Sequence, residues 1–343
     1  MHIRHLRIDG IFPITLQLEP SNKCNARCAF CPSKNITRPR GTMSFELCKK
    51  IIDEAVAYPQ FSRIIWYLLG DPFTDDGFFE KVHYAKEKGV GWQHISTNAA
   101  LLDQETARQL LDSAINDINI SLDGNSKKTY EDIRQGLCFE TISENVMRFL
   151  EMKKARGQKN PHVSLRTAYT QTTKAEIASY VARWRPLCDQ INIASVADWA
   201  GQVDYETRRD RSGQRPCECI WDRCGVTWNG NVQYCGDVNG TVEIGNVHDT
   251  NIYELWNVPK MQELRRFHQE GRFNELPICA KCDENRYGLN RDARFIGRSD
   301  GKFVSLERHN PMDFKNIVDC ITEQFDYMPA SQADPSLPGD PAR

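Results

Sequence analysis

Six short apolar runs, rich in β-branched residues, alternate along the chain with longer segments in which apolar residues recur at helical spacing. The runs predict strands at residues 14–19, 63–69, 91–97, 115–122, 162–169 and 191–197. The segments between them predict helices at residues 44–58, 78–89, 103–114, 141–157 and 174–188. The expected N-caps are Ser44 and Asp103, and the expected helix stops are Gly89 and Gly157. Such regular alternation is typical of consecutive βα units around a parallel sheet.

The number of units favours one architecture among the α/β folds. Six units within residues 14–197 would form a parallel barrel shorter than the eight-unit barrel, so we expect a partial (β/α)6 TIM-like barrel. A doubly wound sheet would show the same alternation, and the pattern alone does not separate the two. In both folds ligands bind in the loops at the carboxyl ends of the strands. The segment CNARCAFC, residues 24–31, follows the first strand and lies in such a loop.

The cysteines are distributed unevenly. Three of the thirteen lie in residues 24–31 and six lie between residues 217 and 282. The chain shows neither an N-terminal run of signal-peptide length nor an apolar run long enough to span a bilayer, so we expect a cytoplasmic protein. That compartment keeps thiols reduced, and an odd number would leave one unpaired. The cysteines therefore indicate metal binding or reactive thiols rather than a disulfide framework.

The charge balance disfavours polyanionic partners. Lys and Arg total 44 and Asp and Glu total 46, which gives a net charge of −2. Proteins that bind nucleic acid or anionic membranes usually carry an excess of basic residues. We expect no nucleic acid and no membrane among the partners. With 40% hydrophobic residues, the chain can bury a large core.

The first cysteine group offers three thiols, Cys24, Cys28 and Cys31. Structural zinc sites use four ligands, usually as two close pairs, and this segment has no fourth ligand nearby. Three thiolates can instead hold three irons of a four-iron, four-sulfur cluster. The fourth iron would then be open to a small molecule, which indicates chemistry rather than a structural role.

The spacing C-x3-C-x2-C, with the aromatic Phe30 before the last cysteine, resembles the motif of the radical S-adenosylmethionine (radical SAM) superfamily. The resemblance implies that Cys24, Cys28 and Cys31 ligate a [4Fe-4S] cluster and that Phe30 contacts the adenine. It further implies that the open iron binds S-adenosylmethionine. One electron would then cleave this cofactor to a 5′-deoxyadenosyl radical that abstracts hydrogen from the substrate. An external one-electron donor such as flavodoxin or ferredoxin is also expected.

Residues 69–72, LGDP, resemble the family's Gly-Gly-Glu-Pro motif, which receives the ammonium group of S-adenosylmethionine. The match assigns Gly70, Asp71 and Pro72 to the cofactor. Leu69 replaces the first glycine, and Asp71 is one methylene shorter than glutamate. Gly70 and Pro72 therefore match as a backbone feature better than Asp71 matches as a ligand. A plain turn is the alternative for Gly-Asp-Pro.

Polar residues end the third and fourth predicted strands, in STNA and SLDG. By the resemblance, these residues lie against the ribose and carboxylate of the cofactor: Thr97, Asn98, Ser121 and Asp123. Hydroxyl, amide and carboxylate groups can make those hydrogen bonds. Strand-end turns are the alternative interpretation.

Two arginines are further candidates. The segment YEDIRQG resembles a family segment whose arginine pairs with the cofactor carboxylate, which makes Arg134 a bidentate partner. An arginine on a helix surface is the alternative. The sequence does not decide whether Arg166, in the fifth strand, points into or out of the barrel.

The second cysteine group resembles the twitch domain, a shortened form of the SPASM domain. The resemblance implies one auxiliary [4Fe-4S] cluster with the ligands Cys217, Cys235, Cys279 and Cys282. A hairpin stapled by zinc is the alternative. Cys219 and Cys224 exceed the pattern and are interpreted as inert side chains, alternative ligands or a thiol near the substrate.

Residues 226–234, VTWNGNVQY, predict a β-hairpin, because Asn-Gly between alternating strands favours a type I′ turn. Residues 251–271 predict a helix interrupted near Pro259. We expect a barrel at residues 1–200, an auxiliary cluster domain at residues 201–285, and an extension at residues 286–343 with a disordered end.

Three functional hypotheses remain open. The first is an enzyme that oxidises or epimerises a small polar substrate of the sugar or aminocyclitol type. The second is a peptide maturase, although the first strand begins at about residue 14 and leaves no room for a leader-binding domain before it. The third, an iron-sulfur protein without catalysis, is disfavoured because it would not need the S-adenosylmethionine motifs.

Oxidation is slightly favoured over epimerisation, because a fully ligated auxiliary cluster can accept an electron. Epimerisation would instead need a hydrogen donor such as the thiol of Cys219 or Cys224. Asp198, which ends the sixth strand before Trp199, is a candidate base for a hydroxyl proton or else a simple loop cap.

Overall fold

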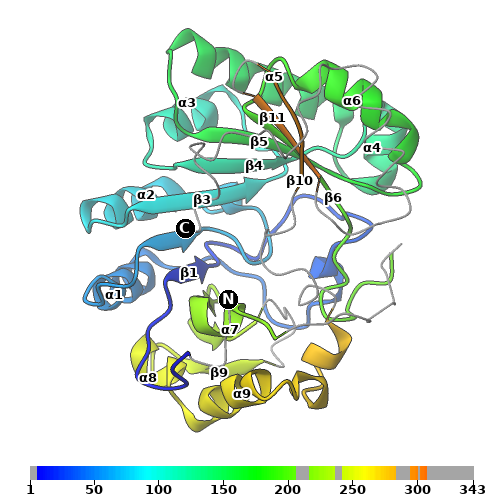
Figure 1. The fold of residues 1–343 in the computed structure, drawn as a ribbon. Helices are drawn as coiled ribbons and strands as arrows, with labels where there is room; N and C mark the ends of the chain where they lie inside the picture. Colours follow the sequence, from blue (N-terminus) through cyan, green and yellow to red (C-terminus); the bar gives the residue numbers. More distant parts are fainter. Residues whose placement is uncertain (1–5, 206–215, 236–241, 283–293, 300–301, 307–343) are drawn as a thin grey trace.

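The computed structural model describes residues 6–205, 216–235 and 242–282, and the backbone of two further strands at residues 294–299 and 302–306 (Figure 1). The predicted disordered end and Cys320 lie outside the described residues. Six strands form the barrel: β1 (Thr15–Leu18), β2 (Arg63–Ile65), β3 (Trp92–Thr97), β4 (Asp117–Ser121), β5 (His162–Ala168) and β6 (Gln190–Ala194).

Helices alternate with these strands as predicted. The α-helices are α1 (Phe45–Ala55), α2 (Phe78–Glu87), α3 (Gln104–Asp112), α4 (Lys127–Ile133), α5 (Phe139–Ala155) and α6 (Ile177–Trp184). Short 3-10 turns are η2 (Pro32–Asn35), η3 (Pro72–Thr74) and η4 (Lys174–Glu176). The predicted caps are confirmed, since Ser44 accepts from the Leu47 N–H and Asp103 accepts from the Thr106 N–H. The additional helix α4 was not predicted.

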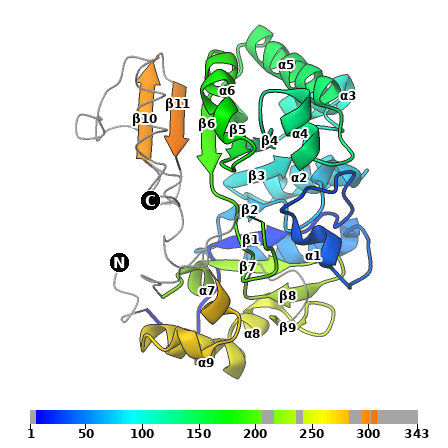
Figure 2. The ribbon, with the colours of Figure 1, turned by 90° about the vertical axis from the view of Figure 1, so that its right-hand side faces the viewer.

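The strand order decides between the two architectures that the sequence left open. Strands β1 to β6 are parallel and adjacent in chain order, so every crossover turns the same way. A doubly wound sheet would reverse its order at a switch point. The partial (β/α)6 barrel is therefore confirmed. Figure 2 shows the helices along one side of the curved sheet.

The two faces of this sheet differ in chemistry. Gln93 of β3 donates to the Val82 carbonyl of α2, which identifies the face that packs on the helices. Ile95 lies on the same face and pairs in register with Ile118 of β4, and both side chains are completely buried. Residues at alternate positions therefore point to the interior of the barrel.

A second group of elements extends the sheet beyond β1. It comprises α7 (Cys219–Asp222), β7 (Arg223–Val226), β8 (Asn231–Gln233), β9 (Glu243–Asn246), α8 (Ile252–Trp256), α9 (Pro259–Gln269), η5 (Phe273–Glu275) and η6 (Cys279–Lys281). Strand β7 pairs in parallel with β1, and β7, β8 and β9 are antiparallel. At the opposite edge, β10 (Arg294–Ser299) and β11 (Lys302–Leu306) form a hairpin in which β11 pairs with β6.

The hairpin and the interrupted helix are confirmed, but the predicted type I′ turn is wrong. The Gly230 N–H donates to the Thr227 carbonyl, and Gly230 is left-handed with φ of 87°. Asn229 is not left-handed, whereas a type I′ turn needs positive φ at both central residues. The turn spans Thr227 to Gly230, and in it only the glycine adopts a positive φ.

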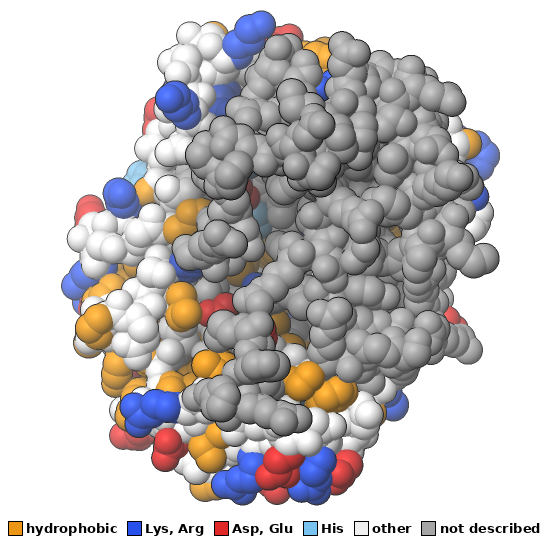
Figure 3. All heavy atoms as spheres, viewed as in Figure 1, with side chains coloured by type: hydrophobic (Ala, Val, Ile, Leu, Met, Phe, Trp, Pro, Cys, Tyr) orange, Lys and Arg blue, Asp and Glu red, His pale blue; other side chains and the backbone are white. Residues whose placement is uncertain are grey.

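Charges of both signs are interspersed on the described surface. Along α9, at the lower edge in Figure 3, exposed acidic and basic side chains alternate, among them Lys260, Glu263, Arg266 and Glu270. This pattern agrees with the near-neutral net charge. Within the described residues, every helix is too short or too polar to cross a membrane.

Candidate functional site

The three-cysteine loop lies at the carboxyl end of β1 and is fixed by the chain that follows α4. The Arg27 N–H donates to the Gln135 carbonyl, and the Ala29 N–H donates to the Ile133 carbonyl. Hydrogen bonds of the backbone thus hold the loop in place. The loop therefore lies at the carboxyl ends of the strands, where the site is predicted.

Each thiol of the loop has a nitrogen donor nearby. The Ser33 N–H lies 3.4 Å from the Cys31 sulfur, an Arg134 nitrogen lies 3.4 Å from the Cys28 sulfur, and the Asn98 amide lies 3.7 Å from the Cys24 sulfur. Such donors stabilise sulfur that carries negative charge. The arrangement therefore suits thiolate ligands.

Burial has the opposite effect on the metal-free thiols. It raises the pKa of Cys24 to about 11, and it also raises the pKa of Cys31. A thiol must lose its proton to ligate a metal, so metal binding at this loop releases protons.

Residues 70–72, Gly-Asp-Pro, contact the backbone that leads into the cysteine loop. Gly70 is left-handed, with φ of 79°, and a Cβ atom there would collide with the carbonyl oxygens of Ser21 and Lys23. The Asp71 N–H donates to the same Lys23 carbonyl over 2.9 Å. Pro72 begins the turn η3. A glycine is required here because the backbone leading into the cysteine loop packs directly on it.

The buried Asp71 carboxylate is occupied by groups of the protein. It accepts hydrogen bonds from the Thr97 hydroxyl at 2.8 Å, the Asn98 N–H at 2.9 Å and the Phe73 N–H at 3.1 Å. Asp71 therefore fixes the end of β3. It thereby orients the Asn98 side chain, which also donates to Asn25 in the cysteine loop over 2.8 Å.

Arg134 is not on a helix surface, so that alternative is wrong. Its side chain is 13% exposed and forms a 2.5 Å ion pair with Asp123, which is almost fully buried. Asp123 also accepts from the Ala168 N–H at the end of β5. The guanidinium carbon lies 5.4 Å from the centre of the Phe30 ring. Asp123, Arg134, Phe30 and Cys28 thus form one connected group of side chains.

The loop after β6 places Asp198 near the same end of the barrel. Asp198 is 3% exposed, and its carbonyl accepts from the Val203 N–H. Trp199 and Ala200, which follow it, have positive φ of 52° and 58°. Two successive residues other than glycine in this conformation are rare and frequently mark functional loops.

Half-buried polar side chains line the interior face of the sheet. Ser121 of β4 pairs in register with Arg166 of β5, which in turn pairs with Asn192 of β6. All three are partly exposed, whereas the neighbouring Ile120 and Ile193 are fully buried against the helices. The register answers the question left open by the sequence, because it places Arg166 inside the barrel.

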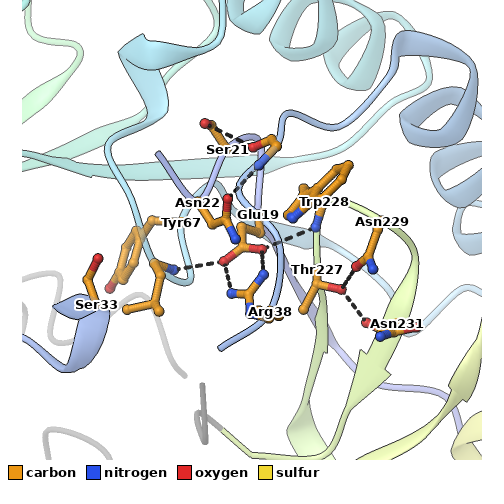
Figure 4. A network of polar contacts seen from close by, with 12 residues as sticks. Glu19, Ser21, Asn22, Ser33, Arg38, Tyr67, Thr227, Trp228, Asn229 and Asn231 are labelled. Atoms are coloured by element: carbon orange, nitrogen blue, oxygen red, sulfur yellow. Dashed lines mark hydrogen bonds and ion pairs between the residues drawn. The ribbon is translucent and has the colours of Figure 1, made fainter. Parts of the chain in front are cut away.

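Glu19 is a residue that the sequence analysis missed. It follows β1, is completely buried, and forms a two-pronged ion pair with Arg38 at 2.5 and 2.6 Å (Figure 4). Its carboxylate also accepts from the N–H groups of Leu69 and Trp228, each over 3.2 Å. The acid thus joins the barrel to the β7–β8 hairpin. An acidic residue ending an apolar strand just before the cysteine motif was the available signal.

The second cysteine group brings together thiols from distant parts of the chain. Cys217 forms a hydrogen bond with Cys219, and this contact and burial raise the pKa of Cys217. Cys235 and Cys282 are close enough to add to that increase by charge repulsion. Cys279, on the short turn η6, lies 3.4 Å from a ring nitrogen of His268.

Cys219 and Cys224 occupy different environments. Cys219 lies beside the predicted ligand Cys217. Cys224 is fully buried in β7, opposite Leu16 of β1, and burial strongly raises the pKa of its thiol. The structure thus gives Cys224 the environment of an inert core residue, while Cys219 lies among the candidate ligands.

Among the described residues, three possible metal-ligand atoms come within 4.8 Å of one another only at Glu131, Cys138 and Glu140, which are largely exposed. These three residues belong to neither cysteine group.

His268 is the second residue that the sequence analysis missed. It lies in the last turn of α9, is completely buried, and accepts from the Cys217 N–H over 2.9 Å. Burial lowers the pKa of its imidazole to about 4. The helical pattern alone gave no signal, because His268 occupies an ordinary core position of an amphipathic helix.

Comparison with known proteins identifies two domains. A family model described as the radical SAM superfamily matches residues 18–183, and one described as an iron-sulfur cluster-binding domain, SPASM, matches residues 217–283. These ranges contain all the cysteines of the two groups.

Several known proteins are similar to this chain. The mycofactocin maturase MftC of Mycobacterium ulcerans is 32% identical over 153 residues, which cover 45% of this chain and 40% of that protein. The aligned segments span less than half of the curated relatives' length.

Two solved structures share the fold at low sequence identity. BtrN in complex with AdoMet and 2-DOIA has a TM-score of 0.55 at 16% identity, covering 80% of this chain and 94% of that chain. Streptococcus suis SuiB bound to S-adenosylmethionine has a TM-score of 0.61 at 17% identity, covering 78% and 71%. The partial barrel with its additional domain is thus a known architecture.

Proposed function

Because this chain belongs to the radical SAM superfamily and carries a SPASM-type iron-sulfur domain, we propose that it oxidises a small polar substrate of the sugar or aminocyclitol type. Its cofactors are S-adenosylmethionine, the [4Fe-4S] cluster that binds it, and an auxiliary cluster. When bound, these groups supply reductive cleavage of S-adenosylmethionine, removal of a hydrogen atom from the substrate, and an acceptor for one electron.

The cysteine loop holds the first cluster in this proposal, through Cys24, Cys28 and Cys31. Donors from Ser33, Arg134 and Asn98 already face the three sulfurs. The fit rests on this donor set.

The surrounding polar groups orient S-adenosylmethionine. Phe30 offers its ring to the adenine, Arg134 offers its remaining guanidinium N–H groups to the carboxylate, and Asn98 offers hydrogen bonds at the end of β3. Asp123 holds Arg134 in place, and Asp71 holds Asn98 in place. Gly70 and Pro72 shape the backbone below the cofactor, while Thr97 and Ser121 supply hydroxyl groups.

The observation that carries the substrate proposal is the polar interior of the barrel. Ser121, Arg166 and Asn192 lie side by side on three adjacent strands and are partly exposed. Barrels of this kind usually fill their interior with branched apolar side chains. A face that offers hydroxyl, guanidinium and amide groups instead suits a substrate with several hydroxyl or amino groups.

Oxidation of an alcohol to a carbonyl removes one hydrogen atom from carbon, one proton from the hydroxyl group and one electron. Asp198, at the carboxyl end of β6, is our candidate for the proton acceptor. For the auxiliary cluster we propose Cys217, Cys235, Cys279 and Cys282. Four thiolate ligands leave no open iron to hold substrate, which favours the role of electron acceptor.

A peptide is the second candidate substrate. MftC is named a maturase, and a structure of SuiB contains its precursor peptide SuiA. The match to BtrN favours the small molecule, since it covers 94% of a protein solved with 2-DOIA.

Isotope transfer tests the proposal. The reduced, reconstituted protein is incubated with S-adenosylmethionine and, separately, with sugars or aminocyclitols deuterated at their carbinol carbons. We expect deuterium in 5′-deoxyadenosine and a product that has lost two hydrogens. Arg166→Ala should weaken this transfer while cleavage of S-adenosylmethionine without substrate persists, and Arg108→Ala on the exposed face of α3 should behave like the parent.

Two results would overturn the oxidation proposal. Label transfer from deuterated peptides alone would establish a maturase. A product of unchanged formula that gains solvent deuterium, with the gain lost in Cys219→Ala or Cys224→Ala, would establish an epimerase.

A further inference from the structure

One buried histidine joins two cysteines of the second domain. The His268 Nδ1 atom lies 2.9 Å from the Cys217 backbone nitrogen, and its Nε2 atom lies 3.4 Å from the Cys279 sulfur. The imidazole is completely buried. It thus bridges two segments that are more than sixty residues apart in the chain.

The backbone contact determines which ring nitrogen carries the proton. The N–H of Cys217 can only donate, so Nδ1 must accept and cannot hold a proton itself. A neutral imidazole then carries its proton on Nε2. Nε2 faces the Cys279 sulfur, and His268 is therefore an N–H donor to that sulfur.

The orientation of the ring is fixed before any cluster binds. His268 stacks on Phe273 with ring centres 5.5 Å apart and planes inclined by 23°. The helix α9 fixes its backbone, and Cys217 fixes the far side of the ring. The donor is therefore held in place, which removes most of the entropic cost of forming the bond.

We propose that His268 is a positioning residue that donates a hydrogen bond to the Cys279 thiolate and raises the reduction potential of the auxiliary cluster. This inference rests on the proposed function, because it takes Cys279 as a cluster ligand. Reduction adds negative charge to a cluster, and an N–H aimed at a ligand sulfur stabilises that charge. A cluster with a raised potential accepts an electron from the substrate more readily.

The test measures the potential of the auxiliary cluster alone. The first cluster is removed by replacing Cys24, Cys28 and Cys31 with Ala, and the remaining cluster is titrated electrochemically with detection by electron paramagnetic resonance. We expect a lower midpoint potential in His268→Leu than in this parent. His268→Gln, whose amide can still donate, should lie between them. His248→Leu, at an exposed position of the same domain, should not shift the potential.

A measurement on the unmutated residue covers the case in which His268→Leu fails to retain its cluster. With ¹⁵N-labelled histidine, pulsed resonance of the reduced cluster should show a weak nitrogen coupling in the parent. The coupling should disappear in His268→Gln, in which every remaining histidine carries the same ¹⁵N label. The absence of this coupling in the parent would overturn the proposal. So would a fully loaded His268→Leu with the parent's potential.

Iron analysis separates failure of this inference from failure of the proposed function. If the triple cysteine variant binds no iron at all, the auxiliary cluster itself is absent. If it binds a cluster that Cys279→Ala retains, the auxiliary cluster stands but Cys279 is not its ligand, and the role of His268 is overturned.

Discussion

The two cysteine groups differ in how the chain brings their thiols together. The first draws its three thiols from a single loop of eight residues, braced by charged and polar side chains from β3 and α4. The second gathers thiols from before and within α7, after β8 and around η6. The first site is local in sequence and surrounded by partners for a cofactor. The second is assembled only when its domain folds.

Because of this difference, the sequence alone indicates the ligands of the first group more precisely than those of the second. Spacing alone constrains three thiols in one loop, since the backbone between them is short. In the second group the sequence supplies more thiols than one cluster needs, and only the fold shows which are neighbours.

The largest expected effect concerns the first group. Replacing Cys24, Cys28 and Cys31 together with Ala should remove about half of the iron and abolish formation of 5′-deoxyadenosine, because the second group binds independently. Iron analysis and chromatography of the reaction check this. Cys138→Ser, at an exposed position, is the control and should keep both properties. Loss of all the iron would show that the second group holds no cluster of its own.

The second group should lose only its own cluster. Cys217→Ala should bind about half of the parent's iron yet still cleave S-adenosylmethionine, whereas Cys224→Ala, in the core of β7, should keep all of it. We also predict that Cys219→Ala keeps its iron. If Cys219→Ala loses the second cluster and Cys217→Ala or Cys279→Ala retains it, the ligand assignment must change. One zinc per chain in place of the second cluster would reject it entirely.

Glu19 links the barrel to the β7–β8 hairpin, and we expect its substitution to reduce the stability of the protein strongly. Glu19→Gln breaks the buried ion pair between Glu19 and Arg38, and breaking such a pair costs about 3–5 kcal/mol. Urea denaturation of the metal-free protein, followed by circular dichroism, measures the loss. Glu105→Gln removes an exposed ion pair with Arg108 on α3 and should change stability little. Equal effects of the two substitutions would contradict the role given to Glu19.

A smaller effect is expected within the barrel. The two oxygens of the Asp71 carboxylate accept hydrogen bonds from the backbone N–H groups of Phe73 and Asn98. In Asp71→Asn an NH2 group replaces one of these oxygens, so one of the two backbone N–H groups loses its acceptor. One unsatisfied buried donor costs about 1–3 kcal/mol. Asp76→Asn, a few residues away and exposed, is the matched control. Equal thermal unfolding temperatures for the two variants would show that Asp71 does not fix the end of β3.

Much of the fold could be predicted because it repeats. Each barrel strand and most helices carry a periodic apolar pattern, and Ser44 and Asp103 mark helix starts through their own side chains. Helix α4 was not predicted, because its seven residues are too few to show a helical repeat of apolar positions. The hairpin turn was assigned to the wrong type because Thr227 closes a longer loop than the Asn-Gly pair suggested.

The candidate site was predictable where a motif is contiguous and not where the fold makes the contact. Phe30, Arg134 and Asp123 were named from separate segments, but their grouping appears only at the end of the folded strands. The direction of Arg166 depends on strand register. Glu19 and His268 are single residues whose importance comes from partners far away in the chain, so no local pattern marks them.

The parallel pairing of β1 with β7 also has a consequence for biosynthesis. Thr15 pairs with Arg223, so the edge of β1 waits for about two hundred further residues before its partner is translated. Such distant pairings slow folding, and an uncovered strand edge in the meantime can pair with another nascent chain. The cysteine loop that follows β1 is translated early, but the contact of Glu19, at the end of β1, with the Trp228 N–H can form only after the hairpin is translated. Until the β7–β8 hairpin is made, the free edge of β1 is therefore exposed to such pairing.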